Sequence, residues 1–146
     1  MQEFIFRGKL KKDDYNMKAG DWFESTGLIH QTDFYGTPCD RYFIVDGGDT
    51  LDYDIGEPYE VEPDTVGQFI GRFDINGKRI FTGDIVRIVA HSHMPVYDKP
   101  LIVDWFDDYG LGLCGLSGHR WRESILTFTK CEVIGNKWDN PELMEV

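Results

Sequence analysis

Apolar and polar residues alternate over short stretches along most of the chain. In Phe4–Leu10, the side chains of Phe4 and Phe6 fall on one side of an extended segment, and those of Ile5 and Arg7 fall on the other. Alternation with a period of two residues predicts β-strands. Similar patterns predict strands at Trp22–Ile29, Arg41–Val45, Tyr59–Val61, Gln68–Phe73, Lys78–Phe81, Ile85–Ala90, Leu101–Phe106, Leu111–Leu116, Ser124–Phe128 and Cys131–Asn136. No segment sustains a helical period, so we expect a mainly β fold.

Turn signals separate these strands. Asp74–Gly77 places Asn-Gly between two apolar runs, which predicts a hairpin because tight turns need positive φ angles. Thr82–Asp84 predicts a second sharp turn. The residues expected to have structural roles at turns are Gly67, Gly71, Asn76, Gly77, Gly83, Asp84, Gly135, Asn136 and Pro141. Asn140, Pro141 and Glu142 have the form of a helix start, with Asn140 as the cap, and predict at most one short C-terminal helical turn.

Two connections interrupt the strand pattern. Gly36–Pro38 predicts a loop between the second and third strands. Residues 46–64 form a longer connection, rich in glycine and proline, in which only one short strand is expected. A connection of this length is usually functional or marks a boundary. We therefore predict an N-terminal β lobe with an acidic loop, residues 1–64, and a C-terminal small β-barrel or sandwich, residues 65–146.

The charge of the chain is strongly negative and uneven. The net charge is −11 over 146 residues, and residues 46–64 hold eight carboxylates and no Lys or Arg. Such a field repels nucleic-acid backbones and anionic membranes. We expect no membrane partner and no direct nucleic-acid partner. The acidic segment fits a basic protein surface, and its candidate interaction residues are Asp49, Asp52, Asp54 and Glu57. The alternative is that these acids only keep the protein soluble.

Cysteine usage and the first residues indicate the compartment. The chain has three cysteines, an odd number without a CxxC motif, which is typical of a reducing cytoplasm. Its start lacks the basic and apolar regions of a signal peptide, and no apolar stretch is long enough to span a bilayer. We therefore expect a cytoplasmic protein.

Soft-metal ligands are few and irregularly spaced. The candidates are His91, His93, His119, Cys114 and Cys131. His91 and His93 would share a face of an extended segment, but the other spacings do not match a zinc site. No phosphate-binding loop or nucleophile motif is present in the sequence. We expect neither a metal nor a cofactor, and no catalytic residue is assigned.

Two segments leave other functions open. Asp104, Asp107 and Asp108 lie beside Trp105 and Tyr109, a composition found in hydrolytic clefts and also in ordinary acidic turns. Gly118–Arg122 combines His, Trp and two arginines, and a small β-barrel could use such a patch to stack on and neutralise a nucleic-acid strand. The net charge of −11 disfavours that role.

Four blocks of the sequence resemble the YopX family of phage and prophage proteins. The blocks are Phe6–Lys9 with Gly20–Trp22, Tyr42–Val45, Thr65–Val86 with its Asp-x-Asn-Gly and Gly-Asp-Ile-Val elements, and Glu132–Asn136 with Asp139–Leu143. The resemblance implies a small, mostly β, barrel-like protein encoded by a temperate phage. It implies no assigned activity, so no functional residue is carried over.

We therefore expect a phage or prophage accessory protein in the cytoplasm of a bacterial host. Its expected role is non-catalytic: it binds a protein partner or assembles with itself as a homo-oligomer, because edge strands must be covered. Two alternatives stay open. One is an acidic decoy that binds a basic host protein. The other is a small hydrolase-like or nucleic-acid-binding β-barrel.

Overall fold

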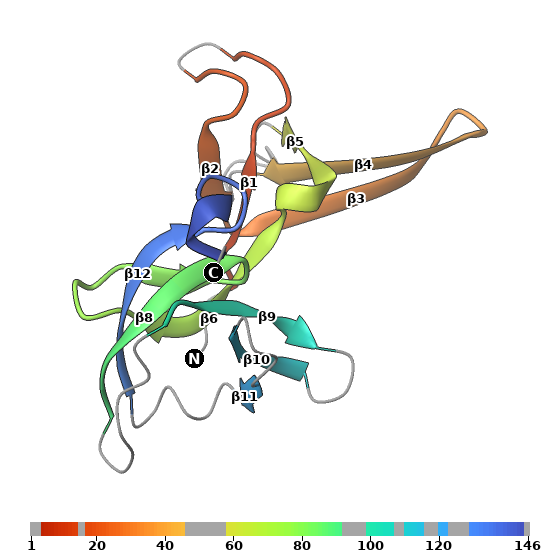
Figure 1. The fold of residues 1–146 in the computed structure, drawn as a ribbon. Coiled ribbons are helices and arrows are strands. Elements are labelled where there is room, and N and C mark those ends of the chain that lie inside the picture. Colours follow the sequence, from red (N-terminus) through yellow and green to blue (C-terminus); the bar gives the residue numbers. More distant parts are fainter. Residues whose placement is uncertain are drawn as a thin grey trace, which may run out of the picture. The chain divides into compact units, whose positions relative to one another are not determined.

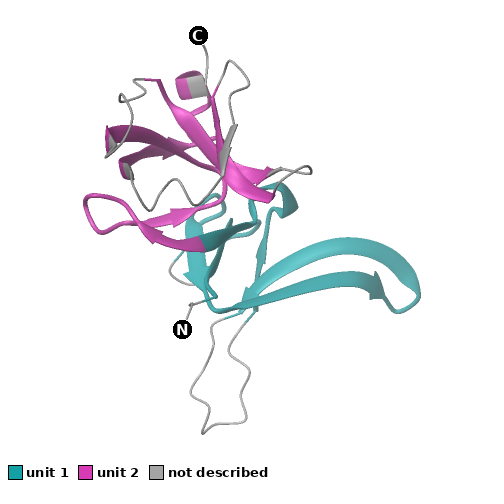
Figure 2. Ribbon diagram, turned by 90° about the horizontal axis from the view of Figure 1, so that it is seen from below, with its two compact units in different colours: residues 1–69 teal, residues 70–146 magenta. Residues whose placement is uncertain are grey.

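A computed structural model of the chain describes residues 4–14, 17–45, 58–91, 99–106, 110–115, 120–122 and 129–144. These residues belong to two compact units, residues 1–69 and 70–146 (Figure 2). The predicted boundary after residue 64 falls in a short 3₁₀ turn, η1 (Pro63–Thr65), whereas the two units divide inside strand β6 (Gly67–Phe73).

Unit 1 contains two antiparallel groups of strands (Figure 1). The strands are β1 (Phe6–Lys9), β2 (Trp22–Ser25), β3 (Gly27–Phe34), β4 (Thr37–Val45), β5 (Pro58–Val61) and the start of β6. β1 pairs with β2 on one side and with the first residues of β6 on the other. β3, β4 and β5 form a separate sheet in that order. Residues 9–11 join the two groups, since Leu10 bridges to Val61.

The core of unit 1 is small and lies where these strands meet. Leu10, Ile44 and Val61 are at most 2% exposed, and half-buried aromatic and aliphatic side chains surround them. Gly8 permits this packing, because a Cβ atom at Gly8 would lie 2.8 Å from the Cβ of Val61. The core therefore depends on a close approach between β1 and β5.

Unit 2 is built on a five-stranded antiparallel sheet in the order β11-β10-β9-β8-β12. Its elements after β6 are β7 (Arg79–Phe81), β8 (Asp84–His91), β9 (Leu101–Phe106), β10 (Gly110–Gly115), β11 (Arg120–Arg122), β12 (Thr129–Asn136) and a 3₁₀ turn, η3 (Pro141–Met144). Among the described residues, its core cluster has more buried members than that of unit 1. It consists of Ile70, Ile80, Val86, Ile88, Leu101, Val103, Leu113 and Cys131.

The mainly β fold class is confirmed, and so is the short C-terminal turn, η3. The predicted strand at Trp22–Ile29 is wrong in its bounds, since it is two strands, β2 and β3. The loop expected at Gly36–Pro38 is a tight turn at Tyr35 and Gly36, from which β4 begins at Thr37. Both faces of the outer half of β3 are exposed, so the alternation that marks a strand is missing there.

The barrel expected in the C-terminal unit is not found among the described strands. Closing the five-stranded sheet would require hydrogen bonds between its end strands, β11 and β12. The outer edge of β12 is occupied instead, because Ile75 donates a backbone hydrogen bond to Cys131 and Val133 donates one to the Asp74 carboxylate. The described sheet is therefore open. None of the described helices is long and apolar enough to cross a membrane.

Candidate protein-interaction site

Most residues predicted to act chemically lie outside the described part of the chain. These are Asp49, Asp52, Asp54, Glu57, His93, Asp107, Asp108, Tyr109 and His119. His91 ends β8, and Arg120–Arg122 form β11. The Asp104 carboxylate accepts hydrogen bonds from Lys137 at 3.2 Å and from the Trp105 backbone at 2.9 Å. Within the described ranges, no group of three His, Cys, Asp or Glu side chains is arranged to hold a metal ion.

The turn residues occupy two kinds of position. Gly67 and Gly71 lie within β6, and Gly135 lies within β12 at a register shift. Asn76, Gly77 and Gly83 lie in turns, Asp84 opens β8, Asn136 ends β12 and Pro141 begins η3. Gly83 has φ of 91°, and a Cβ atom there would lie 2.3 Å from the Trp138 ring. Gly83 is therefore required both for the turn and for the packing of Trp138.

The predicted cap residue, Asn140, does not cap η3 with its side chain. Its Oδ1 atom accepts a hydrogen bond from the Asn136 backbone at 3.3 Å. The Asn136 Oδ1 atom in turn accepts bonds from the backbones of Trp138 and Asp139 at 3.1 and 2.9 Å. These bonds close the turn between β12 and η3, so Asn140 stabilises the preceding turn and not the helix start.

The hairpin turn between β6 and β7 is fixed to β12 by one buried carboxylate. Asp74 is 7% exposed. Its Oδ1 atom accepts backbone hydrogen bonds from Asn76 and Lys78 at 2.9 and 2.8 Å, and its Oδ2 atom accepts one from Val133 at 3.0 Å. Burial acts to raise the pKa of Asp74, but these three N–H groups and the Lys78 charge outweigh burial and lower it. The residue is structural.

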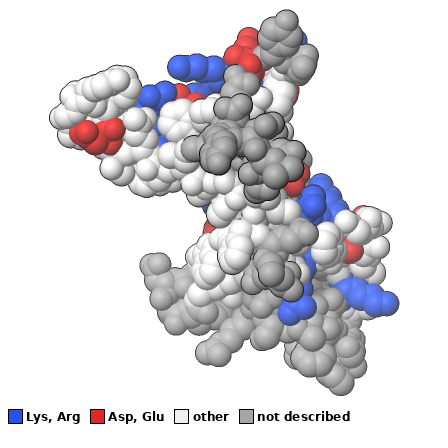
Figure 3. Space-filling model, turned by 180° about the vertical axis from the view of Figure 1, so that it is seen from behind, with Lys and Arg blue, Asp and Glu red and all other residues white. Residues whose placement is uncertain are grey.

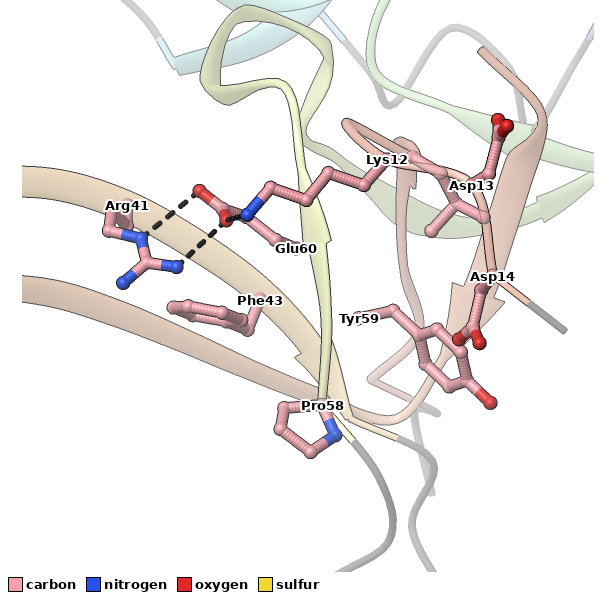
Figure 4. Close-up of a pocket in the computed structure, with 9 residues that line it drawn as sticks. Lys12, Asp13, Asp14, Arg41, Phe43, Pro58, Tyr59 and Glu60 are labelled. Atoms are coloured by element: carbon pink, nitrogen blue, oxygen red, sulfur yellow. Dashed lines mark hydrogen bonds and ion pairs between the residues drawn. The ribbon is translucent and has the colours of Figure 1, made fainter. Parts of the chain in front are cut away.

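A cavity of about 240 Å³ lies in unit 1 beside β4 and β5 (Figure 4). Arg41 donates to Glu60 through Nε at 3.1 Å and through a terminal nitrogen at 2.9 Å, and the Arg41 guanidinium lies 4.9 Å from the Phe43 ring centroid. Lys11 and Lys12 lie 3.6 and 3.9 Å from the same carboxylate. The hydrogen bonds from Arg41 lower the pKa of Glu60 against the opposing effect of burial. Glu60 is thus neutralised by cations and is a poor candidate for a general base.

The β3–β4 hairpin extends from this cavity and is exposed over its outer half. Figure 1 shows its two strands leaving the rest of unit 1 as a ribbon that ends in a tight turn. At the turn, Phe34 is 50% exposed and Tyr35 is 93% exposed, and the two rings make an edge-to-face contact at 4.7 Å. We call Asp33, Phe34, Tyr35 and Gly36 the hairpin tip. Figure 3 shows carboxylates and uncharged side chains at this end of the hairpin.

The hairpin is held in shape by contacts between its own strands. The His30 and Tyr42 rings stack at 4.1 Å with an angle of 5° between their planes. His30 also bonds to Asp40, and Arg41 bonds to the Gln31 side chain at 3.4 Å. Tyr35 has a positive φ of 48°, and Gly36, with φ of 84°, donates to the Asp33 carboxylate at 3.2 Å. The tip is therefore a defined turn that presents two aromatic rings to solvent.

Sequence reasoning missed the tip because it assigned Gly36–Pro38 to a loop. The available signal was Asp33 followed by Tyr35-Gly36, a turn composition that could have been read as a hairpin flanked by polar strands. The Arg41–Glu60 pair was not predictable, because it depends on how β5 pairs with β4 across residues 46–57.

Comparisons with known proteins agree with this architecture. No curated protein matches the chain. The crystal structure of protein EF1440 from Enterococcus faecalis is similar, with a TM-score of 0.54 and 21% sequence identity over 99% of this chain and 100% of that chain. At this identity the similarity shows the fold alone. A family model described as YopX protein matches residues 6–145, nearly the whole length. The chain therefore belongs to the YopX family.

Proposed function

We propose that this protein is a non-catalytic accessory protein of a phage or prophage, and that it binds a partner protein through the hairpin tip. The observation that carries the proposal is the exposure of Phe34 and Tyr35 at the end of a ribbon whose outer half, residues 31–41, supplies no residue to the described core cluster of unit 1. Large aromatic side chains are the commonest anchors of protein interfaces. Three free cysteines favour a reducing bacterial cytoplasm as the place of action.

Without a partner, the outer half of the hairpin adds little to the stability of the fold. A two-stranded ribbon is only marginally stable in water unless it packs against another element. From Gln31 to Phe34 the described side chains of β3 are mostly exposed, so the outer half of the ribbon buries little apolar surface. A rigid turn that displays two rings loses little conformational entropy on binding. These features favour recognition over a purely structural role.

The test is capture of a partner by variants of the tip. The tagged chain, a Phe34→Ser/Tyr35→Ser variant and a Trp105→Ser control are incubated with lysate from host cells producing the phage. Trp105 is a matched control because it is 60% exposed and lies in unit 2. We expect a protein captured by the natural chain and by the control to be lost from the tip variant, with at least tenfold less recovered. Equal recovery by all three proteins would contradict the proposal.

A further inference from the structure

The described sheets end in six edge strands, and five of them are short or covered. β2, β5, β7 and β11 have three or four residues each. β5 is also bonded on its outer side, where Lys11 donates to the Glu60 carbonyl at 3.0 Å. β12 has eight residues, but the hairpin turn at Asp74 and Ile75 covers its edge. Proteins manage edge strands in these two ways to prevent pairing with another chain.

β3 is the exception among the described edges. It has eight residues, and among the described strands it pairs only with β4. Its first five residues, Gly27–Gln31, contain no lysine, proline or carboxylate and no register shift, which are features that commonly block an exposed edge. Its outer backbone groups are therefore available to a further strand.

The direction of these backbone groups follows from two contacts. The Gln31 carbonyl accepts a bond from the Cys39 thiol, so it points towards β4. The Glu60 carbonyl accepts a bond from Lys11 and so points away from β4. Phe43 lies opposite Glu60 on β4, and its backbone N–H and C=O groups therefore point the other way, towards Ile29 on β3. Since backbone groups alternate along a strand, Leu28 and His30 direct their N–H and C=O groups to the open edge.

The regular part of β3 is symmetric about one exposed apolar residue. Thr26 separates β3 from β2, and a register shift interrupts the pairing between Gln31 and Asp33. The uninterrupted stretch is therefore Gly27–Gln31, whose central residue is Ile29. Ile29 is 45% exposed and lies directly opposite Phe43, on the same face of the sheet.

We propose that β3 pairs antiparallel with β3 of a second copy of this chain, across a twofold axis at Ile29. In this register, Leu28 of each copy lies opposite His30 of the other, and both have backbone groups directed to the shared edge. Ile29 lies opposite Ile29 of the second copy, in the closer, non-hydrogen-bonded kind of pair. The whole of Gly27–Gln31 is matched with itself, as a twofold interface requires.

The side chains of β3 disfavour a shift of this register towards the hairpin tip. A shift of the axis to His30 places two imidazoles opposite each other, and a shift to Gln31 places Ile29 opposite Asp33. With the axis at Ile29, the two hairpin tips lie at opposite ends of the paired stretch. Asp33 and Asp40 of one copy therefore do not face the same residues of the other. The pairing joins the Ile29–Phe43 pairs of the two copies into one apolar row. A second copy therefore fits this edge.

The first test is the molar mass of the intact protein by light scattering over a concentration series. We expect a dimer for the natural chain, and a shift of at least tenfold towards monomer for Ile29→Lys, because like charges directly opposite are unfavourable. Val89→Lys is the matched control, since Val89 is also 45% exposed but lies on β8. A monomer for the natural chain, or a dimer unaffected by Ile29→Lys, would overturn the proposal.

A second variant keeps the test informative if Ile29→Lys fails to fold. In a background with Cys39→Ser and Cys114→Ser, Ile29→Cys is expected to form a disulfide-linked dimer under mild oxidation, because Cα atoms about 4.5 Å apart are within disulfide range. Val89→Cys is the control and is expected to remain uncrosslinked. A folded Ile29→Cys protein that stays uncrosslinked overturns the register.

Pairing through β3 does not depend on partner binding by the hairpin tip, so either proposal can fail while the other holds. Ser at Phe34 and Tyr35 is expected to leave the dimer mass unchanged, since neither residue lies in Gly27–Gln31. Loss of capture with an intact dimer supports both proposals. Loss of dimer mass in that tip variant would show that pairing extends beyond Gln31 and overturn the register proposed here.

Discussion

Two hairpins of this protein, β3–β4 and β6–β7, use the same local turn chemistry in different roles. In the β6–β7 hairpin, Asp74 accepts backbone hydrogen bonds and Gly77 has φ of 79°. In the β3–β4 hairpin, Asp33 accepts a backbone hydrogen bond and Gly36 has φ of 84°. Asp74 also accepts a hydrogen bond from the Val133 backbone on β12. The hydrogen bond that Asp33 accepts from Gly36 stays within its own turn.

A turn motif therefore fixes the local path of the chain but not the role of the turn. The third hydrogen bond of Asp74, to Val133, spans 59 residues and ties the turn to the sheet of unit 2. The bond of Asp33 spans only three residues and is exposed. The β6–β7 turn therefore contributes to stability by covering an edge, whereas the β3–β4 turn is left exposed as a candidate interaction site.

The comparison is tested most strongly by removing each aspartate. Asp74→Ala leaves three backbone N–H groups without their acceptor, two in the turn and one on β12. We expect a loss of about 2–5 kcal/mol in the free energy of unfolding, because bonds to charged groups are strong and unpaired buried donors are costly. Asp33→Ala removes one exposed bond and is expected to cost about 0.5 kcal/mol or less. Urea unfolding of both variants measures the difference.

Asp74→Asn is the control for the loss of the carboxylate itself. An amide keeps one acceptor oxygen, so its effect should fall between those of the natural chain and Asp74→Ala. Equal losses for Asp74→Ala and Asp33→Ala would contradict the claim that only the first turn is tied to the sheet.

The second test uses acid. Because the pKa of Asp74 is lowered in the folded protein, its charge contributes stability that is fully present above its unfolded pKa, about 3.9. This contribution is lost as the pH falls through the folded pKa. The difference in unfolding free energy between the natural chain and Asp74→Asn should be constant above about pH 5 and shrink below it. Subtracting the two curves removes the parallel effect of Glu60, whose pKa is also lowered. If this difference in unfolding free energy does not change with pH, the charge of Asp74 does not contribute to stability.

The sequence predicted the fold best where local chemistry and burial agree. The β6–β7 hairpin combines Asn76-Gly77 with buried residues such as Ile70 and Ile80, so turn signal and alternation point to the same structure. The outer half of β3 has no buried face, and a pattern-based reading therefore ended its strand at Ile29, before Phe34. A hydrophobic pattern reports burial, and an exposed ribbon leaves no such pattern.

The candidate site was less predictable than the fold for the same reason. Asp49 and the other acids of its segment were chosen for their charge, and they lie outside the described residues. Phe34 and Tyr35 belong to no motif in the sequence, and their position at the end of a ribbon depends on the pairing of β3 with β4. The open edge of β3 could not be read from the sequence, because it is defined by strand order across three sheets.

The mildest test compares two cysteines, one beside each hairpin. Cys131 is 4% exposed under the β6–β7 turn, and its burial, together with the Asp74 charge, raises its pKa to about 11. Cys39 lies on β4 of the exposed hairpin and is half-buried. Since the thiolate is the reactive form, an alkylating reagent at about pH 8 should modify Cys39 well before Cys131 in a Cys114→Ser background.

This labelling reports the exposure of each cysteine together with the pKa of its thiol, so Asp74→Asn, which removes the same charge, is the control for Asp74→Ala. If the β6–β7 turn protects Cys131 as proposed, Asp74→Ala should speed its modification while leaving the rate at Cys39 unchanged. Equal rates at the two cysteines in the natural chain would mean that the turn opens as readily as the exposed hairpin. In that case the contrast between a turn tied to a sheet and a turn left free for a partner would not hold.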